Sequence, residues 1–583
     1  MHEEVDELLY PKGKGRPRQL ATDVFLAAVI QTALQGWKLT LVNVHGTLTN
    51  AIPASMARAL GTLYKPSPGE PERWISVRMV RYLLSRIELV LAFTEGRAPG
   101  LGDEERDERE ASFKGLLNRV LAVSLPTGLP RPSAFALDAT AVDAWGKGKK
   151  RRKEPGSESS PSRRNPRRLK KLKKKDRPTG TEEGEPVDED DIIKDSHLEG
   201  ALEEGHVFDP DAEWGYRTKT YDNRTNACFG YNMFAMVNVP PLGTEKGSVP
   251  KVAWRIALRP ANVDEVEPGL SLLDELREEA PVEELLADRA WSYAVPERWA
   301  NELRARDVEP VFDLHPADRG VRDYKQMQYV DGWGHCPCMS RINPETGRDR
   351  IDIRPPEKWS VGELKKKATP VDIRRHKERE EALAQFRADV DERWRWAFEL
   401  VANAPNGAKD PNKQRWTCPA QVGKVRCPLV KASMRLSETL PLVENPPGPE
   451  TAPPSCKGRT FTVPGEVTAK LRQRHYWGSE KWIESYTRRT NVEGYFGNWK
   501  NSSTENVNRG WCKVVGIVKT ALLAVCAAAA TNIRLLRTWS TKEPVPPGFS
   551  DPLCEPDPPD YGYEELAEDG SIALYEHPPD EGG

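Results

Sequence analysis

Two aspartates interrupt apolar segments of this chain, where an unpaired carboxylate is costly. Asp138 lies in the middle of "FALDATAV", and Asp288 ends the apolar run of "LLADRA". If the two segments are neighbouring strands, their carboxylates lie close together and cannot both ionise comfortably without a cation between them. Such oxygen ligands suit Mg²⁺ or Mn²⁺. Either aspartate alone could instead cap a turn or helix, so a metal site requires the pair and a third acid.

The stretch "YTRRTNVEGYFGNWKNSS" (residues 486–503) supplies one acid among bases, aromatics and glycines. On a single α-helix, at about 100° per residue, four of its residues share one stripe. They are Tyr486, Arg489, Glu493 and Lys500. One acid between two cations and a phenol is a poor metal cage alone, but it suits a polyanion that runs along the helix. An ordinary solvated helix face has the same composition and is the alternative.

The rest of this helix is expected to hold the stripe in place. Ser479 is the expected N-cap. An apolar arc beside the stripe is expected to pack on a sheet, and it consists of Val492, Tyr495, Phe496 and Trp499. Gly494 and Gly497 each cost about 1 kcal/mol in a helix interior. We therefore expect another backbone to come close to them.

The segments around the two aspartates alternate between strand and helix patterns. Short apolar runs bounded by turn residues predict strands at 133–145, 227–239, 251–260, 282–288 and 308–314. The second and third of these are expected to form a hairpin or adjacent strands. Helical periodicity occurs at 262–279 and 297–307. This order predicts an α/β fold with a mixed sheet flanked by helices.

The N-terminal part of the chain has a different pattern. Residues 17–125 space their apolar side chains at helical intervals, with Thr22 as the expected first N-cap and Gly36 ending that helix. We therefore assign residues 1–130 to an N-terminal helical domain. Such a domain either binds DNA in the manner of a helix-turn-helix module or simply packs on the core.

Charge divides the rest of the chain, although its net charge is only −2. We expect the core in 131–330 and 459–540, with a charged, disordered insertion at 146–205, a cysteine-containing insertion at 331–458 and an acidic, disordered tail at 541–583. The basic run 147–177 either clamps the DNA backbone or is a solvated linker. We favour DNA contact, because this insertion leaves the strand that carries Asp138.

The spacing Y-x2-R-x3-E-x6-K of the stripe resembles the YREK signature of bacterial insertion-sequence transposases, which belong to the DDE group with an RNase H-like catalytic core. The contexts "FALDAT" and "LLADRAW" are similar to those of that family's first two aspartates. The resemblance implies that Asp138, Asp288 and Glu493 bind catalytic Mg²⁺ or Mn²⁺. It also implies that three residues of the stripe hold transposon-end DNA, namely Tyr486, Arg489 and Lys500.

The activity implied by the resemblance is metal-dependent cleavage at transposon ends and strand transfer into target DNA. The implied partners are terminal inverted repeats, target DNA and a second copy of the chain in a synaptic complex. Two alternatives stay open: an RNase H-like nuclease without strand transfer, and a catalytically inactive DNA-binding descendant. The long charged insertion at 146–205 departs from the family pattern.

The nine cysteines are expected to be reduced. Four of them could form a zinc site in the second insertion, namely Cys336, Cys338, Cys418 and Cys427, with His335 beside them and Cys456 as a substitute ligand. Partly buried thiols without a metal are the alternative. Three further cysteines are expected in the core, namely Cys228, Cys512 and Cys526.

No secretory segment is expected at the N-terminus. The apolar run 514–533 is broken by Lys519 and rich in alanine, which predicts a buried core helix rather than a membrane span. A cytoplasmic, nucleoid-associated protein follows from these expectations.

Aromatic side chains cluster near the acids. Trp291 follows Asp288, and three more precede the stripe, namely Tyr476, Trp477 and Trp482. One of them could stack on an unpaired base, although core packing is the expected role of most. His315 follows a predicted strand, where it has either an accessory or a structural role.

Overall fold

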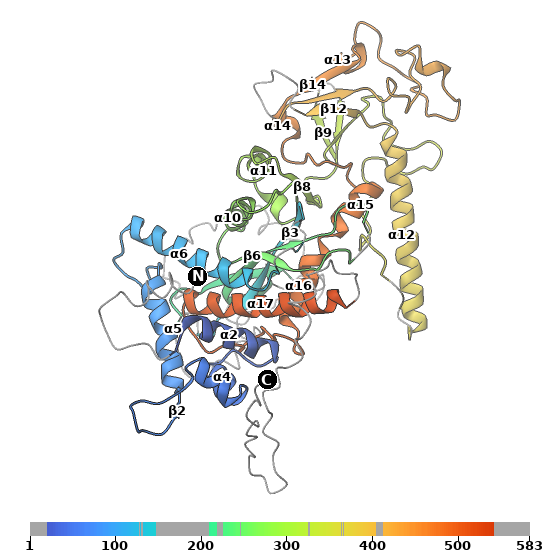
Figure 1. Ribbon diagram of the computed structural model, residues 1–583. Helices are drawn as coiled ribbons and strands as arrows, with labels where there is room; N and C mark the ends of the chain where they lie inside the picture. Colours follow the sequence, from blue (N-terminus) through green and yellow to red (C-terminus); the bar gives the residue numbers. More distant parts are fainter. Residues whose placement is uncertain are drawn as a thin grey trace, which may run out of the picture.

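The computed structural model of the protein describes residues 20–126, 129, 132–146, 209–218, 225–244, 247–324, 327–362, 364, 367–403 and 412–541. The basic run 147–177, the rest of the first insertion up to residue 205 and the tail after Thr541 lie outside these residues. Two lobes are visible in Figure 1: a lower lobe built around a sheet and long helices, and an upper lobe formed by the second insertion together with the strands that flank it.

A six-stranded mixed sheet forms the centre of the lower lobe, in the order β4-β5-β3-β7-β8 with β6 also paired to β5. Its strands are β3 (Ala134–Asp143), β4 (Glu213–Thr218), β5 (Thr225–Asn238), β6 (Ala253–Pro260), β7 (Glu284–Ala287) and β8 (Glu309–Phe312). The pairings of β5 are antiparallel, whereas β3–β7 and β7–β8 are parallel. The predicted strands and the predicted hairpin of β5 and β6 are therefore present, in an α/β fold.

Both faces of the sheet are covered, which explains the apolar character of its strands. Phe135 and Leu137 of β3 point into a cluster that includes Leu272 and Leu273 of helix α10 (Val266–Arg277). Ala136, between them, belongs to the opposite cluster. This alternation follows from the two-residue period of a strand.

Helix α17 (Ile517–Ser540) is the central helix of the lower lobe. It contacts β6 and four helices, namely α2 (Thr22–Leu34), α5 (Val77–Leu91), α6 (Asp103–Ala122) and α16 (Thr490–Lys500). By length and composition α17 could cross a membrane, but 83% of its apolar window is buried inside the fold. The predicted core helix is therefore confirmed. Its Asn532 exchanges two hydrogen bonds of 2.9 Å with the backbone of Ala253 in β6.

The N-terminal residues are helical as predicted. Helices α2, α5 and α6 are joined by α3 (Leu41–Asn50), α4 (Ala54–Ala59) and a short hairpin of β1 (Leu63–Tyr64) and β2 (Arg73–Trp74). The prediction that Thr22 caps α2 is wrong, because Ala21 is the N-cap and Thr22 is a buried first residue of the helix. Gly36 ends the helix as predicted, with a left-handed φ of 71°.

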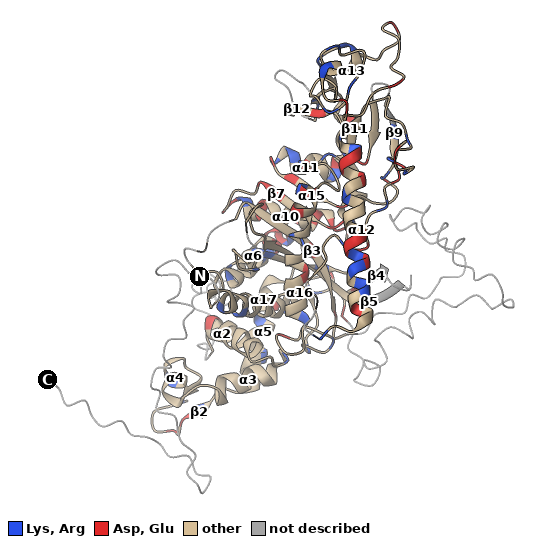
Figure 2. Ribbon diagram, turned by 90° about the vertical axis from the view of Figure 1, so that its right-hand side faces the viewer, with Lys and Arg blue, Asp and Glu red and all other residues tan. Residues whose placement is uncertain are grey.

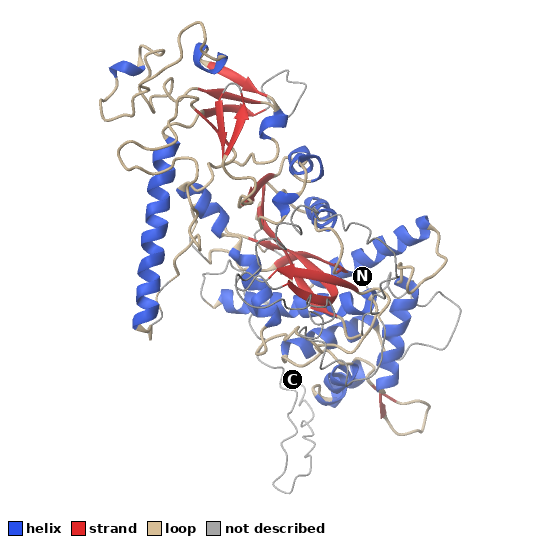
Figure 3. Ribbon diagram, turned by 180° about the vertical axis from the view of Figure 1, so that it is seen from behind, coloured by secondary structure: helices blue, strands red, loops and turns tan. Residues whose placement is uncertain are grey.

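The upper lobe consists of two small sheets and one long helix (Figure 3). One sheet contains β9 (Val321–Tyr324), β10 (Met327–Val330) and β11 (Trp333–His335), and the other contains β12 (Glu399–Asn403), β13 (Gln414–Thr417) and β14 (Thr460–Val463). The long helix is α12 (Pro370–Trp394), which begins with a capping box of Thr369 and Asp372. Figure 2 shows acidic and basic residues interspersed along it.

The remaining short elements connect these parts. They are the 3₁₀-helices η1 (Trp291–Tyr293), η2 (Pro296–Arg298) and η3 (Ser433–Arg435), and the helices α11 (Ala300–Ala305), α13 (Pro454–Lys457), α14 (Gly465–Thr468) and α15 (Glu480–Thr487). The order β7, α11, β8 matches the predicted alternation of strand and helix.

The predicted single helix through residues 486–500 is wrong. Helix α15 ends at Thr487 and α16 begins at Thr490. At the junction, the amide of Arg489 bonds the carbonyl of Tyr486 and the amide of Val492 bonds the carbonyl of Arg489. These bonds span three residues instead of four, so the chain tightens locally to a 3₁₀ turn. Ser479 caps α15 as predicted, accepting from the amide of Trp482.

Candidate active site

Three aspartates lie at matching positions on neighbouring parallel strands: Asp138 is inside β3, whereas Asp288 and Asp313 directly follow β7 and β8. Leu137 of β3 is paired with Ala287 of β7, and Ala287 is paired with Phe312 of β8. The residue after each is an aspartate: Asp138, Asp288 and Asp313. Parallel register therefore brings the two predicted acids together, as the sequence predicted. Asp313 was missed, although "VFDL" has the same pattern of an apolar strand ending in aspartate.

Asp138 is the most constrained of these carboxylates. Its side chain is 26% exposed, and its Oδ1 accepts a hydrogen bond from the amide of Ala139 at 2.8 Å. Burial raises the pKa of Asp138 to about 6 and outweighs the opposing effect of Arg489, while the charges of Asp288 and Glu493 raise it further. A cation at this position would remove the penalty.

Arg489 currently supplies positive charge to the acids. Its guanidinium donates to Glu493 Oε1 at 2.6 Å, and its Nη1 lies 3.9 Å from Asp138 Oδ2. It also interacts electrostatically with Asp288. Asp138, Asp288 and Glu493 are thus gathered around one guanidinium, although α16 is far from β3 and β7 in the sequence.

The three acids fit a divalent cation in donor type. All their donors are oxygens, the strand ends hold two of them in register, and the first turn of α16 presents the third. Within the described part of the chain, however, no three His, Cys, Asp or Glu side chains are arranged to hold a metal ion. Glu493, whose side chain is half exposed, must leave Arg489 to join the aspartates.

Arg488, the neighbour of Arg489, holds the junction between α15 and α16 against the sheet. It forms a buried ion pair with Glu284 of β7, and its Nη1 donates to the carbonyl of Pro240 at 3.0 Å. Ser485 donates to the same glutamate at 3.0 Å. Sequence reasoning did not single out Arg488 or Glu284. The available sequence signal was that Arg488 directly precedes Arg489 and that Glu284 belongs to a predicted apolar strand.

Tyr486 lies inside an aromatic cluster rather than on an open face. Its ring is 6% exposed and stacks on Trp482 at 4.8 Å with an interplanar angle of 13°. Its hydroxyl forms a hydrogen bond with Arg489, and burial raises the pKa of Tyr486 above its usual value. In this structure Tyr486 therefore positions Arg489.

Lys500 ties the end of α16 to the strand that carries Asp138. Its Nζ donates to the carbonyl of Ala141 in β3 at 2.6 Å. The apolar arc of α16 is buried as predicted, at Val492, Tyr495, Phe496 and Trp499. The expectation for Gly494 and Gly497 is wrong, because a Cβ added at either would meet nothing within 4 Å. Open space, not a neighbouring backbone, lies beside both.

The other aromatic residues are mainly structural. Trp291 is buried and lies 4.7 Å from the ring of Trp299. The three aromatics before the signature, Tyr476, Trp477 and Trp482, are also buried. Both ring nitrogens of His335 are engaged, by the hydroxyl of Tyr476 at 2.8 Å and the carbonyl of Trp333 at 3.0 Å. His315 lies against the ring of Tyr293 at 4.3 Å.

Cysteines outside the upper lobe have the expected environment with one exception. Cys512 and Cys526 are buried in the core. Cys228 is half-buried, and its thiol donates to Asp143 at 3.3 Å. The cysteines of the second insertion form a separate cluster.

Residues 452–537 match the family model described as transposase DDE domain. The matched segment contains α15, α16 and most of α17, and therefore includes Tyr486, Arg489, Glu493 and Lys500. No curated protein and no solved structure matches the chain. Residues 452–537 are therefore similar to a transposase DDE domain, and this match supports a transposase role in general. Asp138 and Asp288 lie outside the matched segment.

Proposed function

We propose that this protein is a metal-dependent transposase of the YREK group, with an RNase H-like core that cuts DNA at transposon ends and joins the ends to target DNA. The observation that carries the proposal is the gathering of Asp138, Asp288 and Glu493 around Arg489. The match to a transposase DDE domain supports it, because Glu493 and Arg489 both lie in the matched segment.

The three acids are proposed to hold Mg²⁺ or Mn²⁺. When bound, these ions would activate a water and later a 3′-hydroxyl for in-line attack on phosphodiesters and would stabilise the leaving oxygen. The chain's own part would be to align the donors: β3 and β7 would hold the two aspartates in register, and α16 would supply Glu493.

Arg489 is proposed to exchange partners when the site is loaded. Its guanidinium now bonds Glu493 and would be free for a DNA phosphate once that carboxylate turns to the metal. The hydroxyl of Tyr486 holds the guanidinium near the site during this exchange. Lys500 would add a second positive charge at the C-terminal end of α16, where its Nζ now contacts the carbonyl of Ala141.

The proposed partners are terminal inverted repeats and target DNA, bound by two copies of the chain in the cytoplasm. The N-terminal helices of residues 1–130 and the basic run 147–177 are the proposed sources of further DNA contacts. The open space beside Gly494 and Gly497 leaves the exposed side of α16 accessible to a DNA backbone.

The experiment uses the full chain with DNA that carries the inverted repeats flanking its gene, in the presence of Mg²⁺ or EDTA. We expect cleavage and joining with Mg²⁺ only, and a loss of about 10³-fold or more in Glu493→Gln, equivalent to ~4 kcal/mol of barrier. Glu480→Gln, which alters an exposed acid of α15, is the matched control. Cleavage that survives Glu493→Gln would overturn the assignment.

The products distinguish the alternatives. Cleavage without joining indicates an RNase H-like nuclease, and binding without cleavage indicates an inactive DNA-binding descendant. Joined products that depend on both inverted repeats indicate a transposase.

A further inference from the structure

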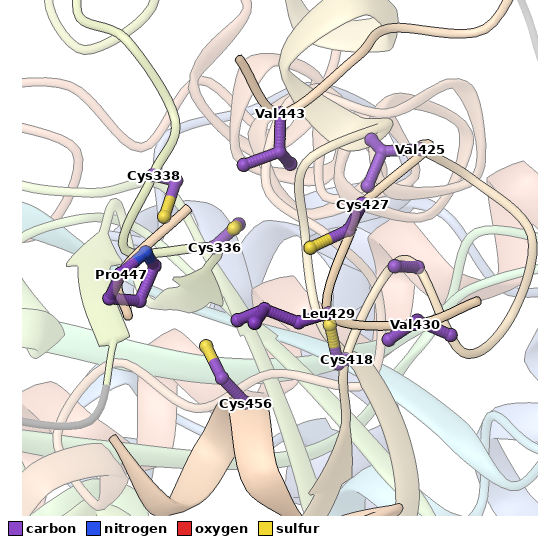
Figure 4. A pocket seen from close by; sticks show the side chains of 11 residues that line it. Cys336, Cys338, Cys418, Val425, Cys427, Leu429, Val430, Val443, Pro447 and Cys456 are labelled. Atoms are coloured by element: carbon purple, nitrogen blue, oxygen red, sulfur yellow. The ribbon is translucent and has the colours of Figure 1, made fainter. Parts of the chain in front are cut away.

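Five cysteines of the second insertion line one pocket in the upper lobe (Figure 4). They are Cys336, Cys338, Cys418, Cys427 and Cys456. The sequence separates them widely, but β11, β13 and α13 bring them together. The other lining residues are apolar, including Val425, Leu429 and Val443. The pocket thus combines several thiols with apolar walls.

Three of the five cysteines begin the same backbone turn. Cys336, Cys418 and Cys427 are each followed by proline. The carbonyl of each accepts from the amide three residues later, with distances of 3.0, 2.9 and 2.9 Å. The thiol sulfur of each also accepts from the amide two residues later. Three cysteines that line the pocket therefore share one backbone geometry.

Cys456 completes a set of four. It lies in α13, directly before the strand β14 that pairs with β13. Its thiol interacts electrostatically with those of Cys418 and Cys427, and the thiol of Cys336 interacts with that of Cys418. Cys338 begins no such turn but is the third residue of the turn that begins at Cys336, and its sulfur accepts a hydrogen bond from the thiol of Cys336. Its thiol also interacts electrostatically with those of Cys418, Cys427 and Cys456.

We propose that Cys336, Cys418, Cys427 and Cys456 bind a structural Zn²⁺ ion as four thiolates. Each ligand gives up its thiol proton on binding, and Zn²⁺ undergoes no redox change. Cys338 is a neighbour of the site and not a ligand. This differs from the set expected from sequence spacing, in which Cys338 was a ligand and Cys456 only a substitute.

Binding requires the thiols to move inward. No three His, Cys, Asp or Glu side chains in the described part of the chain are already at metal-holding positions. Tetrahedral zinc would draw the four sulfurs to about 2.3 Å from one centre. The ion would connect the end of β11, the two turns that begin at Cys418 and Cys427, and α13. It would therefore fix the two small sheets of the upper lobe to each other.

The first test measures metal in the full-length protein purified without chelators. We expect a single zinc ion per chain by elemental analysis, and a single Co²⁺ in its place to give the thiolate charge-transfer and tetrahedral d–d absorption of a four-sulfur site. A protein that carries no zinc and gives no such cobalt spectrum would overturn the proposal. This readout needs no variant and does not depend on DNA cleavage.

The second test identifies the ligands with single Cys→Ser variants. Cys336→Ser, Cys418→Ser, Cys427→Ser and Cys456→Ser are expected to weaken zinc retention against a chelator by about 10-fold or more. Cys338→Ser and Cys512→Ser are expected to retain zinc as the natural chain does. Loss in Cys338→Ser with retention in Cys456→Ser would contradict the ligand set. Where a variant fails to fold, the cobalt spectrum of the natural chain still decides whether four sulfurs bind.

Discussion

The guanidinium of Arg489 donates a hydrogen bond to Glu493 at 2.6 Å and also lies 3.9 Å from the carboxylate of Asp138. One side chain thus neutralises acids from a strand and from a helix. A divalent cation would do the same, so Arg489 and the metal compete for the same carboxylates.

Arg489→Gln is expected to destabilise the metal-free protein by about 3 kcal/mol, because the side chain is only 13% exposed and its removal leaves paired acids uncompensated. Mg²⁺ should restore more of the melting temperature in this variant than in the natural chain. Thermal unfolding with and without Mg²⁺ measures the difference. Arg488→Gln removes a neighbouring buried ion pair with Glu284. The loss of stability in this variant should be the same with and without Mg²⁺. Equal Mg²⁺ responses in the two variants would contradict the competition.

Substitution of Asp313 tests which of the aspartates next to β7 and β8 are needed for DNA cleavage. Its Oδ1 accepts from the indole of Trp477 at 3.0 Å and from the amide of Leu314 at 2.8 Å. Asparagine retains an acceptor for both, so Asp313→Asn should cleave within about tenfold of the natural rate. Asp288→Asn should lose about 10³-fold or more, or ~4 kcal/mol. The reverse order in cleavage assays would assign the metal to Asp313.

Gly494 offers a prediction that separates stability from DNA binding. Because nothing lies within 4 Å of a Cβ at this position, Gly494→Ala should stabilise the protein by about 0.5–1 kcal/mol through better helix propensity. A bulky Gly494→Trp should instead weaken DNA binding, if DNA follows this side of α16. Thermal unfolding and a DNA-binding assay check the two effects. Gly478→Ala is the contrast: its φ is 82° and Phe386 lies 2.7 Å from the added Cβ, so it should destabilise.

Asn532 is expected to contribute strongly to the stability of the contact between α17 and β6. Besides its two bonds to Ala253, its amide donates to Ser124 at 2.9 Å. Asn532→Ala leaves buried backbone groups of β6 unsatisfied and should cost about 2–4 kcal/mol. Chemical unfolding measures the loss. Asn498→Ala, on the half-buried side of α16, should change stability much less, and a similar loss there would remove the special role of Asn532.

His335 gives the stability of the upper lobe a pH dependence. Burial, followed by the charge of Arg393, holds the pKa of His335 well below its usual value, and Lys424 acts in the same direction. The folded state therefore keeps this ring neutral, while the unfolded chain takes up a proton below about pH 6.5. Stability is present above that pH and falls as the pH falls below it.

The measurement compares melting temperatures of the natural chain and His335→Gln between about pH 8 and about pH 5.5. The variant should be less stable at the higher pH, and the difference should shrink as the pH falls. His475, whose pKa is also lowered by burial, remains in both proteins and does not affect the comparison. A constant difference would exclude His335 as the source.

Sequence patterns predicted the parts of the site that depend on local periodicity. The apolar runs ending in Asp138 and Asp288 became paired strands because two-sided burial demands such runs. The arc from Val492 to Trp499 became the buried side of a helix for the equivalent reason. Ser479 was recognisable as a cap because its hydroxyl can reach an amide three residues on.

The features that were missed depend on contacts between distant segments. The turn at Arg488 and Arg489 is fixed by Glu284 of β7, which no periodicity within 486–503 could reveal. The burial of Tyr486 depends on its stacking with Trp482 within a cluster that includes Trp359 of the insertion. The turn shared by Cys336, Cys418 and Cys427 likewise is defined by backbone hydrogen bonds, which the sequence does not show.

The order in which the ribosome releases these segments has a consequence for the cell. Asp138 and Asp288 emerge early, whereas Glu493 follows the whole upper lobe and emerges shortly before α17. A growing or prematurely terminated chain therefore holds both strand aspartates without the third acid. The proposed DNA-cutting centre can be assembled only after synthesis has passed α16, so incomplete chains should be harmless to the chromosome.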